Sequence, residues 1–538
     1  MLICLSGRYI EQELALHYGH LPPSFLPVGG ERLFSAQARA YCAGERAILT
    51  LPDDYEIAAN DQHVLAEAGF EVFAANPRLD LTEAIDEVLR HVGSVPEGEP
   101  VRILFGDTLV DLEASHHRGA DFVAVKPTKV DYPWTYGDQS DGTTRFFENN
   151  LNQMQDTQVV CGYFSFSDLE LLRQAVQEPT LCKALNAYSS TRELQLVDAL
   201  TWHDFGHIAL FYESKRDLLV TRAFNSLDAD DCVITKTSEQ TVKMQAEAIW
   251  FETVPPQILL HTPRFIGRKN KDNKAGYQLE YLHLPTLSEM AVFGRQTHIS
   301  MGLILSRCVQ LLASFRTLRP EPDAPEASPD YAARFYDETI RSKTWSRLQS
   351  FCDGFGCDLQ TQFVLNGETL PPLGEIVATT LAHIPQTQPK DICFWHGDFF
   401  FGNLFFDFNT QRVIMIDPRG MSFDNVLTQY GDIRYDIGKL AHSVLGGYDH
   451  IIANQAQYTR LGPYSFDFHL PSYTGPQRDF ASDLFCRLVE SEFGIETQEL
   501  YALTAIMFFS MLPLHQENPD RQAALFANGL LLSKNLSI

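Results

Sequence analysis

The chain has 538 residues, of which 45% are hydrophobic and 21% charged, and this composition is typical of a globular protein rather than a disordered one. It is too long for a single hydrophobic core, so at least two domains are expected. Its formal net charge of −27 argues against nucleic acid or an anionic membrane as a general partner.

The apolar segments indicate no membrane insertion. Residues 1–8 lack a basic region followed by a long apolar stretch, so no signal peptide is expected. Residues 503–514 form an apolar stretch that contains Pro513 and is too short to span a bilayer, which predicts a buried helix. The 10 cysteines include no C-x-x-C pair. We therefore expect a cytoplasmic protein with reduced thiols.

Short apolar runs alternate with helical patterns over the first two hundred residues. Alternation of this kind predicts an α/β domain with a mostly parallel sheet covered on both faces. The expected strands are residues 2–5, 47–51, 71–74, 101–105, 121–126 and 159–165, and the expected helices are residues 34–42, 61–68 and 81–91.

The pattern changes near residue 216, where a second domain is expected to begin. Strands are predicted at residues 218–223, 232–236 and 278–282, and helices at residues 241–251 and 287–318. The proline-rich residues 319–329 cannot continue the last helix and are expected to form a surface excursion within this domain.

The strongest chemical motif follows an apolar run at residues 392–395. His396, Asp398 and Asn403 lie in the sequence HGDFFFGN, and a second apolar run, residues 413–416, ends at Asp417. Two strands would bring these side chains to the same end of a β-hairpin. Phosphoryl transfer needs such a set, because one carboxylate orients the attacking hydroxyl while an amide and another carboxylate hold Mg²⁺.

This H-x-D-x-x-x-x-N loop and the following I-D motif resemble the aminoglycoside phosphotransferase and choline kinase family. The resemblance implies a bilobal, protein-kinase-like domain over residues 216–538, with an N-lobe at 216–284 and a C-lobe at 285–538. It also implies ATP and Mg²⁺, with Asp398 as catalytic base, Asn403 and Asp417 as Mg²⁺ ligands, and His396 as a brace for the loop. Residues 430–440 resemble a later family segment, whose Asp432 and Asp436 are expected to anchor the loop.

The same resemblance supplies candidates for nucleotide binding. Lys236, at the end of a predicted strand, and Glu247, in the next helix, would form the pair that holds the phosphates. Lys243 is the competing lysine, although it lies inside the predicted helix and is expected to face solvent. Glu280 resembles the start of the hinge that meets adenine, and residues 221–226 take the place of a glycine-rich loop.

Residues 22–33 resemble the P-K-x-L-x-P-V-x-G-x-P-L signature of nucleotidyltransferases that activate sugar phosphates and phosphocholine. Asp107, after a predicted strand, and Asp204, in the sequence WHDFG, match that family's two carboxylates, and residues 162–166 match its G-x-Y-x-F strand. The resemblance implies a Rossmann-like domain over residues 1–215, in which Asp107 and Asp204 bind Mg²⁺ and serve catalysis. Taken alone, Asp107 would more often cap a strand end, and Trp202 would be a core residue.

Two departures from this family remove phosphate-binding groups. The glycine-rich opening is replaced by a sequence that runs through Ser6 and Gly7, and the signature lysine is Ser24. Arg8 and Arg32 are the candidate substitutes.

The two resemblances together predict a bifunctional enzyme. The C-terminal domain would phosphorylate a small alcohol or sugar with ATP, and the N-terminal domain would couple the phosphate to a second nucleotide, with CTP favoured. The product would be an activated precursor for a bacterial surface glycan, and choline, ethanolamine, a polyol and a sugar all stay open as acceptors. One alternative is a stand-alone kinase with a non-catalytic N-terminal domain; another is a pseudoenzyme scaffold, against which the complete kinase motif argues.

Overall fold

The computed structural model describes the chain except residues 43, 94, 97, 114–120, 128–131, 133, 140–141, 149–157, 219–224, 230–231, 271–273, 471–474 and 537–538. The chain divides into two compact units, Met1–Leu219 and Val220–Ile538. The boundary expected between residues 215 and 216 falls inside helix α7 (Ile208–Asp217), which belongs to the N-terminal unit.

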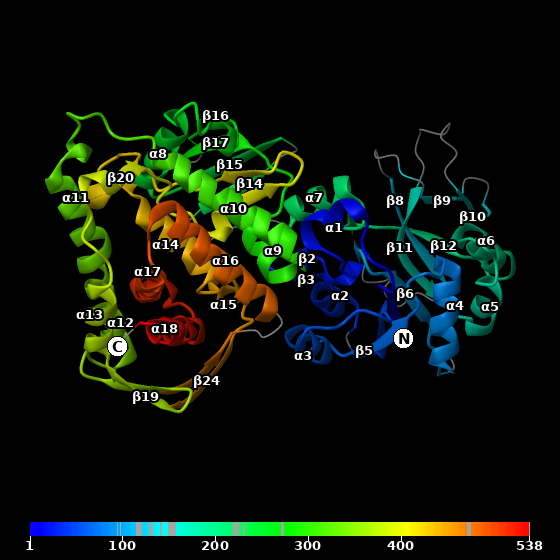
Figure 1. Cartoon of the computed structure of the whole chain (residues 1–538). Helices are drawn as coiled ribbons and strands as arrows, with labels where there is room; N and C mark the ends of the chain where they lie inside the picture. Colours follow the sequence, from blue (N-terminus) through cyan, green and yellow to red (C-terminus); the bar gives the residue numbers. More distant parts are fainter. Residues whose placement is uncertain are drawn as a thin grey trace. The chain divides into compact units, whose positions relative to one another are not determined.

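The N-terminal unit alternates strands and helices as expected (Figure 1). Its elements are β1 (Leu2–Leu5), α1 (Gln12–Tyr18), β2 (Pro27–Val28), β3 (Glu31–Arg32), α2 (Leu33–Tyr41), β4 (Ala47–Pro52), α3 (Ala59–Glu67), β5 (Phe70–Ala75), α4 (Leu81–Val92), β6 (Val101–Phe105), β7 (Thr108–Asp111), β8 (Phe122–Pro127), β9 (Thr135–Asp138), β10 (Arg145–Glu148), β11 (Gln158–Phe166), α5 (Leu169–Ala175), α6 (Leu181–Thr191), β12 (Gln195–Asp198), β13 (Thr201–Asp204) and α7.

The main sheet of this unit has a parallel half and an antiparallel half. Strands β5, β4, β1 and β6 are neighbours in that order and run parallel, with Ile3 opposite both Ile48 and Ile103. Strand β11 then pairs antiparallel with β6, β8 and β9. The parallel half has the topology of a Rossmann-like domain, so the expected α/β class is confirmed.

Both faces of this sheet are covered by helices because successive strand residues point to opposite sides. In β1, Leu2 and Cys4 join the core formed with α1, α2, α3 and α7, whereas Ile3 joins the core formed with α4, α5 and α6. The two groups of helices lie on either side of the sheet in Figure 1.

The C-terminal unit has a small antiparallel sheet followed by a larger, mainly helical part. Its elements are β14 (Asn225–Ala229), β15 (Val233–Ser238), α8 (Thr241–Glu252), β16 (Phe265–Arg268), β17 (Ala275–Glu280), α9 (Leu287–Phe293), α10 (His298–Phe315), α11 (Pro329–Phe335), α12 (Ser342–Phe355), β18 (Gln362–Leu365), β19 (Glu368–Pro372), α13 (Leu373–Ala382), β20 (Ile392–Phe394), β21 (Leu404–Asp407), β22 (Arg412–Met415), β23 (Tyr430–Asp432), α14 (Ile433–Val444), α15 (Tyr448–Ile452), β24 (Gln457–Gly462), β25 (Ser465–His469), α16 (Gly475–Phe493), α17 (Thr497–Met511) and α18 (Pro519–Ser533).

The smaller lobe is a sheet of four antiparallel strands in the order β14, β15, β17, β16, with α8 against it. This arrangement confirms the expected kinase-like lobe, with one change in the strand positions. The strand predicted at residues 218–223 is wrong at Leu218, which lies in a turn, and residues 219–223 lie outside the described residues. The strand before β15 is instead β14.

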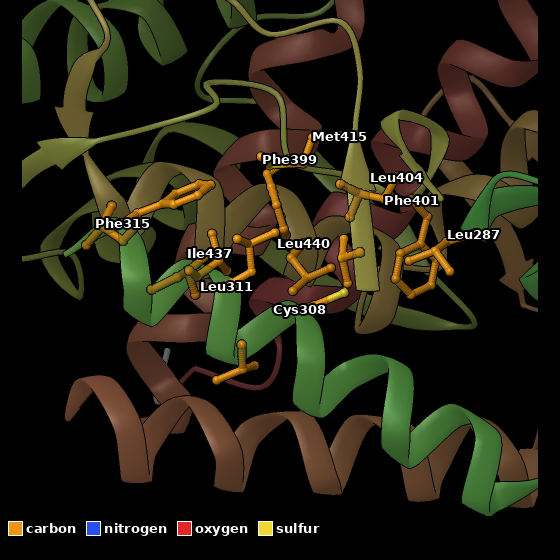
Figure 2. Close-up of a cluster of buried hydrophobic side chains, with 14 of the residues drawn as sticks. Leu287, Cys308, Leu311, Phe315, Phe399, Phe401, Leu404, Met415, Ile437 and Leu440 are labelled. Atoms are coloured by element: carbon orange, nitrogen blue, oxygen red, sulfur yellow. The ribbon is translucent and has the colours of Figure 1, made fainter. Parts of the chain in front are cut away.

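The larger lobe is built around α10, α14 and the hairpin of β21 and β22. Figure 2 shows Cys308, Leu311 and Phe315 of α10 in the same buried cluster as Ile437 and Leu440 of α14. The single helix predicted at residues 287–318 is wrong, because α9 ends at Phe293 and α10 begins at His298. Thr297 caps α10 by accepting a hydrogen bond from the Ser300 N–H, which sets a new helix start.

One described helix, α10, is long and apolar enough to cross a membrane by length and composition. In the structure its apolar residues Leu305, Cys308 and Leu312 are fully buried in the core of the larger lobe. The buried helix predicted at residues 503–514 is also found, as α17.

Candidate active sites

The H-x-D-x-x-x-x-N loop connects β20 to the hairpin of β21 and β22. Its aromatic side chains Phe399 and Phe401 insert into the buried cluster of the larger lobe, as Figure 2 shows. Leu404 and Met415, at the paired ends of β21 and β22, pack in the same cluster. Burial of these apolar side chains thus fixes the loop to the larger lobe, and its polar side chains stay available for chemistry.

Asp398 lies at the centre of the polar side of this loop. One carboxylate oxygen is 2.9 Å from Lys439 Nζ, and the other accepts a hydrogen bond of 3.1 Å from Asn403 Nδ2. Burial raises the pKa of Asp398, but the neighbouring Lys439 outweighs it, so the pKa lies below its ordinary value. The carboxylate therefore stays ionised at neutral pH and can orient a hydroxyl group.

His396 and Asp436 hold the loop in place. His396 is completely buried, and one ring nitrogen bonds the carbonyl of Ile416 at 2.9 Å, just before Asp417. Burial lowers the pKa of His396 to about 4, so the ring is neutral. The Asp436 carboxylate accepts hydrogen bonds from the backbone N–H groups of His396 and Gly397. Asp436 is therefore a loop anchor, as predicted, and Asp432 caps α14 by accepting from Arg434 N–H.

Lys236 connects the two lobes through ion pairs. Its Nζ is 2.6 Å from Glu247 Oε2 and 3.0 Å from Asp417 Oδ1, and Tyr277 OH also donates to Glu247 Oε2. Burial lowers the pKa of Lys236, but the two carboxylates outweigh it and raise the pKa above its ordinary value. Lys243 lies 3.8 Å from the other Glu247 oxygen, with about half of its side chain exposed. The geometry thus brings the expected lysine, rather than its competitor, into the site.

Asp398, Asn403 and Asp417 line one cavity of about 850 Å³. Asp417 has a positive φ of 57°, in the left-handed region that residues other than glycine rarely adopt. The Asn403 amide oxygen and the Asp417 carboxylate are hard oxygen donors, which fit Mg²⁺ held jointly with nucleotide phosphates. Over the described ranges, no three His, Cys, Asp or Glu side chains form a preformed metal site, so the phosphates would complete the coordination.

Glu280 is not brought to this cavity. Its carboxylate accepts a hydrogen bond from the Arg264 N–H, and it borders a different cavity of about 910 Å³ that Phe265 and Asp407 also line. These observations concern the side chain; the expectation that the backbone of the hinge beginning at Glu280 meets adenine stays a prediction. Residues 221–224 of the expected phosphate loop lie outside the described residues.

In the N-terminal unit, a two-stranded sheet brings the two motif aspartates together. Strands β7 and β13 pair antiparallel, with Thr108 opposite Asp204, and Asp107 immediately precedes β7. Gly206 fits between the two carboxylates: its N–H donates to Asp204, and a Cβ there would lie 2.3 Å from an Asp107 oxygen. Two residues almost a hundred positions apart thus form one acidic site.

The electrostatics of this acidic site involve a histidine. Burial first, and then the neighbouring Asp204, raise the pKa of Asp107 to about 7. His207 Nδ1 lies 2.9 Å from Asp204 Oδ2. Burial lowers the pKa of His207, but the two carboxylates outweigh it and raise the pKa above its ordinary value. Such a carboxylate pair repels itself and would be stabilised by a divalent cation.

The candidate phosphate-binding arginines are engaged elsewhere. Arg32 is buried, with its guanidinium bonded to both carboxylate oxygens of Asp61 and to the carbonyl of Phe25, so it does not support phosphate binding. Arg8 is half exposed and bonds the carbonyl of Leu79 and the carboxylate of Asp80.

Ser24, which stands where the nucleotidyltransferases have lysine, is fully buried. Its hydroxyl donates to the carbonyl of Gly106, next to Asp107, and its N–H donates to the Ser6 hydroxyl. Ser24 therefore connects the segment 22–33 to the residues that follow β1 and β6, a structural role for which a charged side chain is not needed.

Several side chains at these sites were not singled out from the sequence. Lys439 follows Asp436 by three residues and Tyr435 by four, a spacing that puts them on neighbouring faces of one helix and could have indicated Lys439. His207 follows Asp204 by three residues, close enough in the sequence to have indicated their contact. Arg419 follows Asp417 by two residues, which could have indicated it, whereas no sequence signal connects Lys343 to the site because its proximity arises from tertiary packing.

The Asp107 carboxyl leads to a prediction about stability. Its folded pKa of about 7 exceeds its ordinary value of 3.8, so the folded unit binds more protons between these values. We expect the melting temperature of the unit, without divalent cations, to fall as pH rises from about 4 to about 7. Asp107→Asn should reduce this fall in calorimetric scans with a chelator, whereas Asp111→Asn, at an exposed position of β7, should not.

Comparison with known protein families finds one match, in the C-terminal unit. Residues 233–463 match the model of the phosphotransferase enzyme family, APH. The C-terminal unit therefore contains a region that matches this family, and the match indicates a phosphotransferase. No curated protein matches the chain.

Solved structures similar to each part of the chain were also found. The nucleoside-diphosphate-sugar pyrophosphorylase of Vibrio cholerae RC9 is 16% identical, with a TM-score of 0.32 over 40% of this chain and 100% of that one. A thermostable mutant of the aminoglycoside phosphotransferase APH(4)-Ia, bound to ADP and hygromycin B, is 9% identical, with a TM-score of 0.35 over 60% and 93%. A glucosamine kinase complex is 11% identical, with a TM-score of 0.36 over 58% and 74%. At these values no activity or substrate is carried over from these proteins.

Proposed function

We propose that the chain is a bifunctional enzyme that phosphorylates a small-molecule hydroxyl with ATP and then couples the phosphate to a second nucleotide. The observation that carries the kinase half is the convergence of Asp398, Asn403 and Asp417 on one cavity, with Lys236 bonded to Asp417. These are the groups that phosphoryl transfer requires.

In the kinase reaction, Asp398 would accept a hydrogen bond from the acceptor hydroxyl and take its proton. The hydroxyl oxygen bonds to the γ-phosphorus, the bond from that phosphorus to the bridging oxygen breaks, and ADP leaves. Mg²⁺, held by Asn403 and Asp417, would neutralise the charge on the phosphates. Lys236, kept charged by Glu247 and Asp417, would donate a hydrogen bond to a nucleotide phosphate oxygen.

In the N-terminal unit, a phosphate oxygen of the phosphorylated acceptor would attack the α-phosphorus of a nucleoside triphosphate, with CTP favoured, and pyrophosphate would leave. Asp107 and Asp204 would hold the Mg²⁺ that neutralises these phosphates. The product would be an activated precursor for a bacterial surface glycan, made in the cytoplasm. Mass spectrometry of products from ATP, Mg²⁺, each nucleoside triphosphate and an acceptor panel tests the whole proposal.

The alternative is a kinase whose N-terminal unit binds no second nucleotide. The engagement of Arg32 by Asp61 and the replacement of lysine by Ser24 favour it, because both remove charge from the phosphate site. The retained pair Asp107 and Asp204 favours the bifunctional enzyme. Absence of any nucleoside-diphosphate product in the screen would decide for the lone kinase.

Lys236 provides a test of the nucleotide site. We expect Lys236→Met to lower kcat/KM for ATP by roughly 10²–10³-fold, because a preorganised charge on the phosphates is lost. Lys243→Met should have a much smaller effect, since that lysine is half exposed and not bonded to Asp417.

Steady-state kinetics at varied ATP would measure both variants. Because Lys236→Met also leaves Glu247 buried without its partner, thermal unfolding must show that the variant is folded at the assay temperature. A damaging Lys243→Met beside a harmless Lys236→Met would exclude this assignment.

A further inference from the structure

The kinase cavity carries a cluster of three cations that the proposed reaction does not use. Lys343 and Arg347 lie one turn apart on α12, and Arg419 follows Asp417 by two residues; together they are called the cation cluster. All three side chains line the same cavity as Asp398 and are partly buried.

Among the described residues, none of the hydrogen-bond or ring contacts of the cation cluster is a carboxylate. Lys343 Nζ donates to Tyr435 OH at 2.9 Å, and Arg347 donates to the carbonyl of Ser510 at 2.6 Å. The Arg419 guanidinium stacks over the rings of Trp395 and Tyr435, at 5.6 and 5.8 Å. Within the part of the chain that the structure describes, none of the three forms an ion pair.

The carboxylates of the cavity, by contrast, already have cationic partners. Asp398 is paired with Lys439, and Glu247 and Asp417 are paired with Lys236. The chain as a whole has 69 acidic and 42 basic residues. In so acidic a chain, three partly buried basic side chains that have no carboxylate partner in its described part are unexpected. Partly buried charges are costly unless something compensates them, and here a bound anion would do so.

The titration of Tyr435 reflects the positive field of this region. Burial raises the pKa of its hydroxyl, but Lys343, Lys439 and Arg419 outweigh burial and lower the pKa to about 7. The pKa of Lys343 falls to about 8, through burial first and then through Arg419 and Arg347, against the opposing effect of Tyr435.

The cluster lies on the acceptor side of the reaction centre. Lys236, the nucleotide lysine, contacts Asp417, whereas Lys439 contacts Asp398, where the acceptor hydroxyl would bind. Tyr435 precedes Lys439 by one turn of α14, and Lys343 is bonded to Tyr435. The contacts thus connect Asp398 to Lys343 of the cluster through Lys439 and Tyr435.

His442 adds a second feature on the same wall of the cavity. It follows Lys439 on α14, is 1% exposed, and has no hydrogen-bond partner at either ring nitrogen among the described residues. Burial lowers its pKa well below the ordinary value, so the ring is neutral, with one donor and one acceptor. A hydroxyl group of a ligand can donate a hydrogen bond to the acceptor nitrogen or accept one from the donor nitrogen.

We propose that the acceptor of the C-terminal unit is an acidic, polyhydroxylated molecule, whose carboxylate or phosphate binds to Lys343, Arg347 and Arg419. One of its hydroxyls faces Asp398, and another bonds His442. The proposal rests on the kinase function above and specifies its substrate class. It disfavours choline, ethanolamine and amino sugars, because a cationic acceptor would meet three positive charges.

The test compares four acceptors built on one sugar ring: glucose, glucuronate, glucose 6-phosphate and glucosamine. ATP-dependent phosphorylation of each is followed by mass spectrometry, and saturable binding by thermal protection in the presence of ATP and Mg²⁺. We expect glucuronate, glucose 6-phosphate or both to be preferred over glucose, with glucosamine the weakest. The two acids separate a carboxylate site from a phosphate site.

The variants Lys343→Met and Arg347→Met assign the preference to the cluster. Each should raise KM for the preferred acid, or weaken the thermal protection it gives, by about tenfold or more, because a charge-assisted hydrogen bond is lost. KM for ATP and for neutral glucose should stay within about twofold. Lys390→Met, which removes an exposed charge from a residue outside the cavity, is the matched control.

Each outcome bears on the proposal. Glucosamine or glucose as the preferred acceptor, with turnover that needs Asp398, would leave the kinase standing and overturn the acidic acceptor. A rise in KM for ATP alone would assign the cluster to the nucleotide and also overturn it. Acid binding that depends on Arg347, without any transfer from ATP, would support the anion site and reject the kinase. No saturable binding of either acid would overturn the proposal even if no acceptor is turned over.

Discussion

Asp398→Asn is expected to abolish ATP-dependent phosphorylation of the true acceptor while the C-terminal unit stays folded. Loss of a positioned base costs roughly 10²–10⁴-fold in rate. The amide keeps the size of the side chain, but it cannot accept the hydroxyl proton, and it no longer compensates the charge of Lys439 at 2.9 Å. The decisive measurement is single-turnover phosphoryl transfer at saturating ATP and acceptor.

A matched control is Asp353→Asn, which neutralises an exposed carboxylate on α12 outside the cavity and should leave the rate unchanged. The loop is anchored by Phe399, Phe401 and the Asp436 hydrogen bonds. Because Asp398→Asn leaves Lys439 without its carboxylate partner, thermal unfolding must show that the variant is folded at the assay temperature. Near-normal turnover in Asp398→Asn would refute the assignment of the base.

The kinase loop could be predicted from the sequence because its spacing encodes its geometry. Two short apolar runs predict a hairpin, and the hairpin brings Asp398, Asn403 and Asp417 to one end whatever surrounds it. The Lys236–Glu247 pair could be predicted from the order of the strand that carries Lys236 and the helix that carries Glu247. The single helix predicted over residues 287–318 failed at residues 294–297, the polar sequence GRQT, where the backbone leaves the helix between α9 and α10.

Features that depend on distant partners could not be predicted. Arg32 was a candidate phosphate ligand, but Asp61, 29 residues away, takes its guanidinium, and nothing in either local sequence indicates the pair. The cation cluster likewise combines α12 with the segment after Asp417. Charge and spacing in the sequence identify residues that could bind a phosphate or a metal ion. Tertiary contacts decide which of these residues are already paired with another side chain.

Asp204→Ala and Asp398→Ala are expected to separate the two activities most clearly, because each should abolish one of them and leave the other. Each candidate site has its own carboxylates, Asp107 with Asp204 in one unit and Asp398 with Asp417 in the other, so neither chemistry should need the other's residues. Asp204→Ala should stop formation of the nucleoside-diphosphate product and let the phosphorylated acceptor accumulate, because removing a metal carboxylate disables the second step.

Asp398→Ala should show the reverse pattern: no product from the free acceptor, and normal product when the phosphorylated acceptor is supplied. Endpoint assays with ATP, Mg²⁺ and each nucleoside triphosphate, read by mass, measure both variants, with Asp111→Asn as the control in the N-terminal unit. Because His207 also bonds Asp204, folding of Asp204→Ala must be checked by thermal unfolding. If Asp204→Ala keeps the nucleotide product, or if the wild type couples no nucleoside triphosphate, the two-step proposal fails. The C-terminal unit would then act as a kinase alone, which the loss of phosphorylation in Asp398→Ala would still demonstrate.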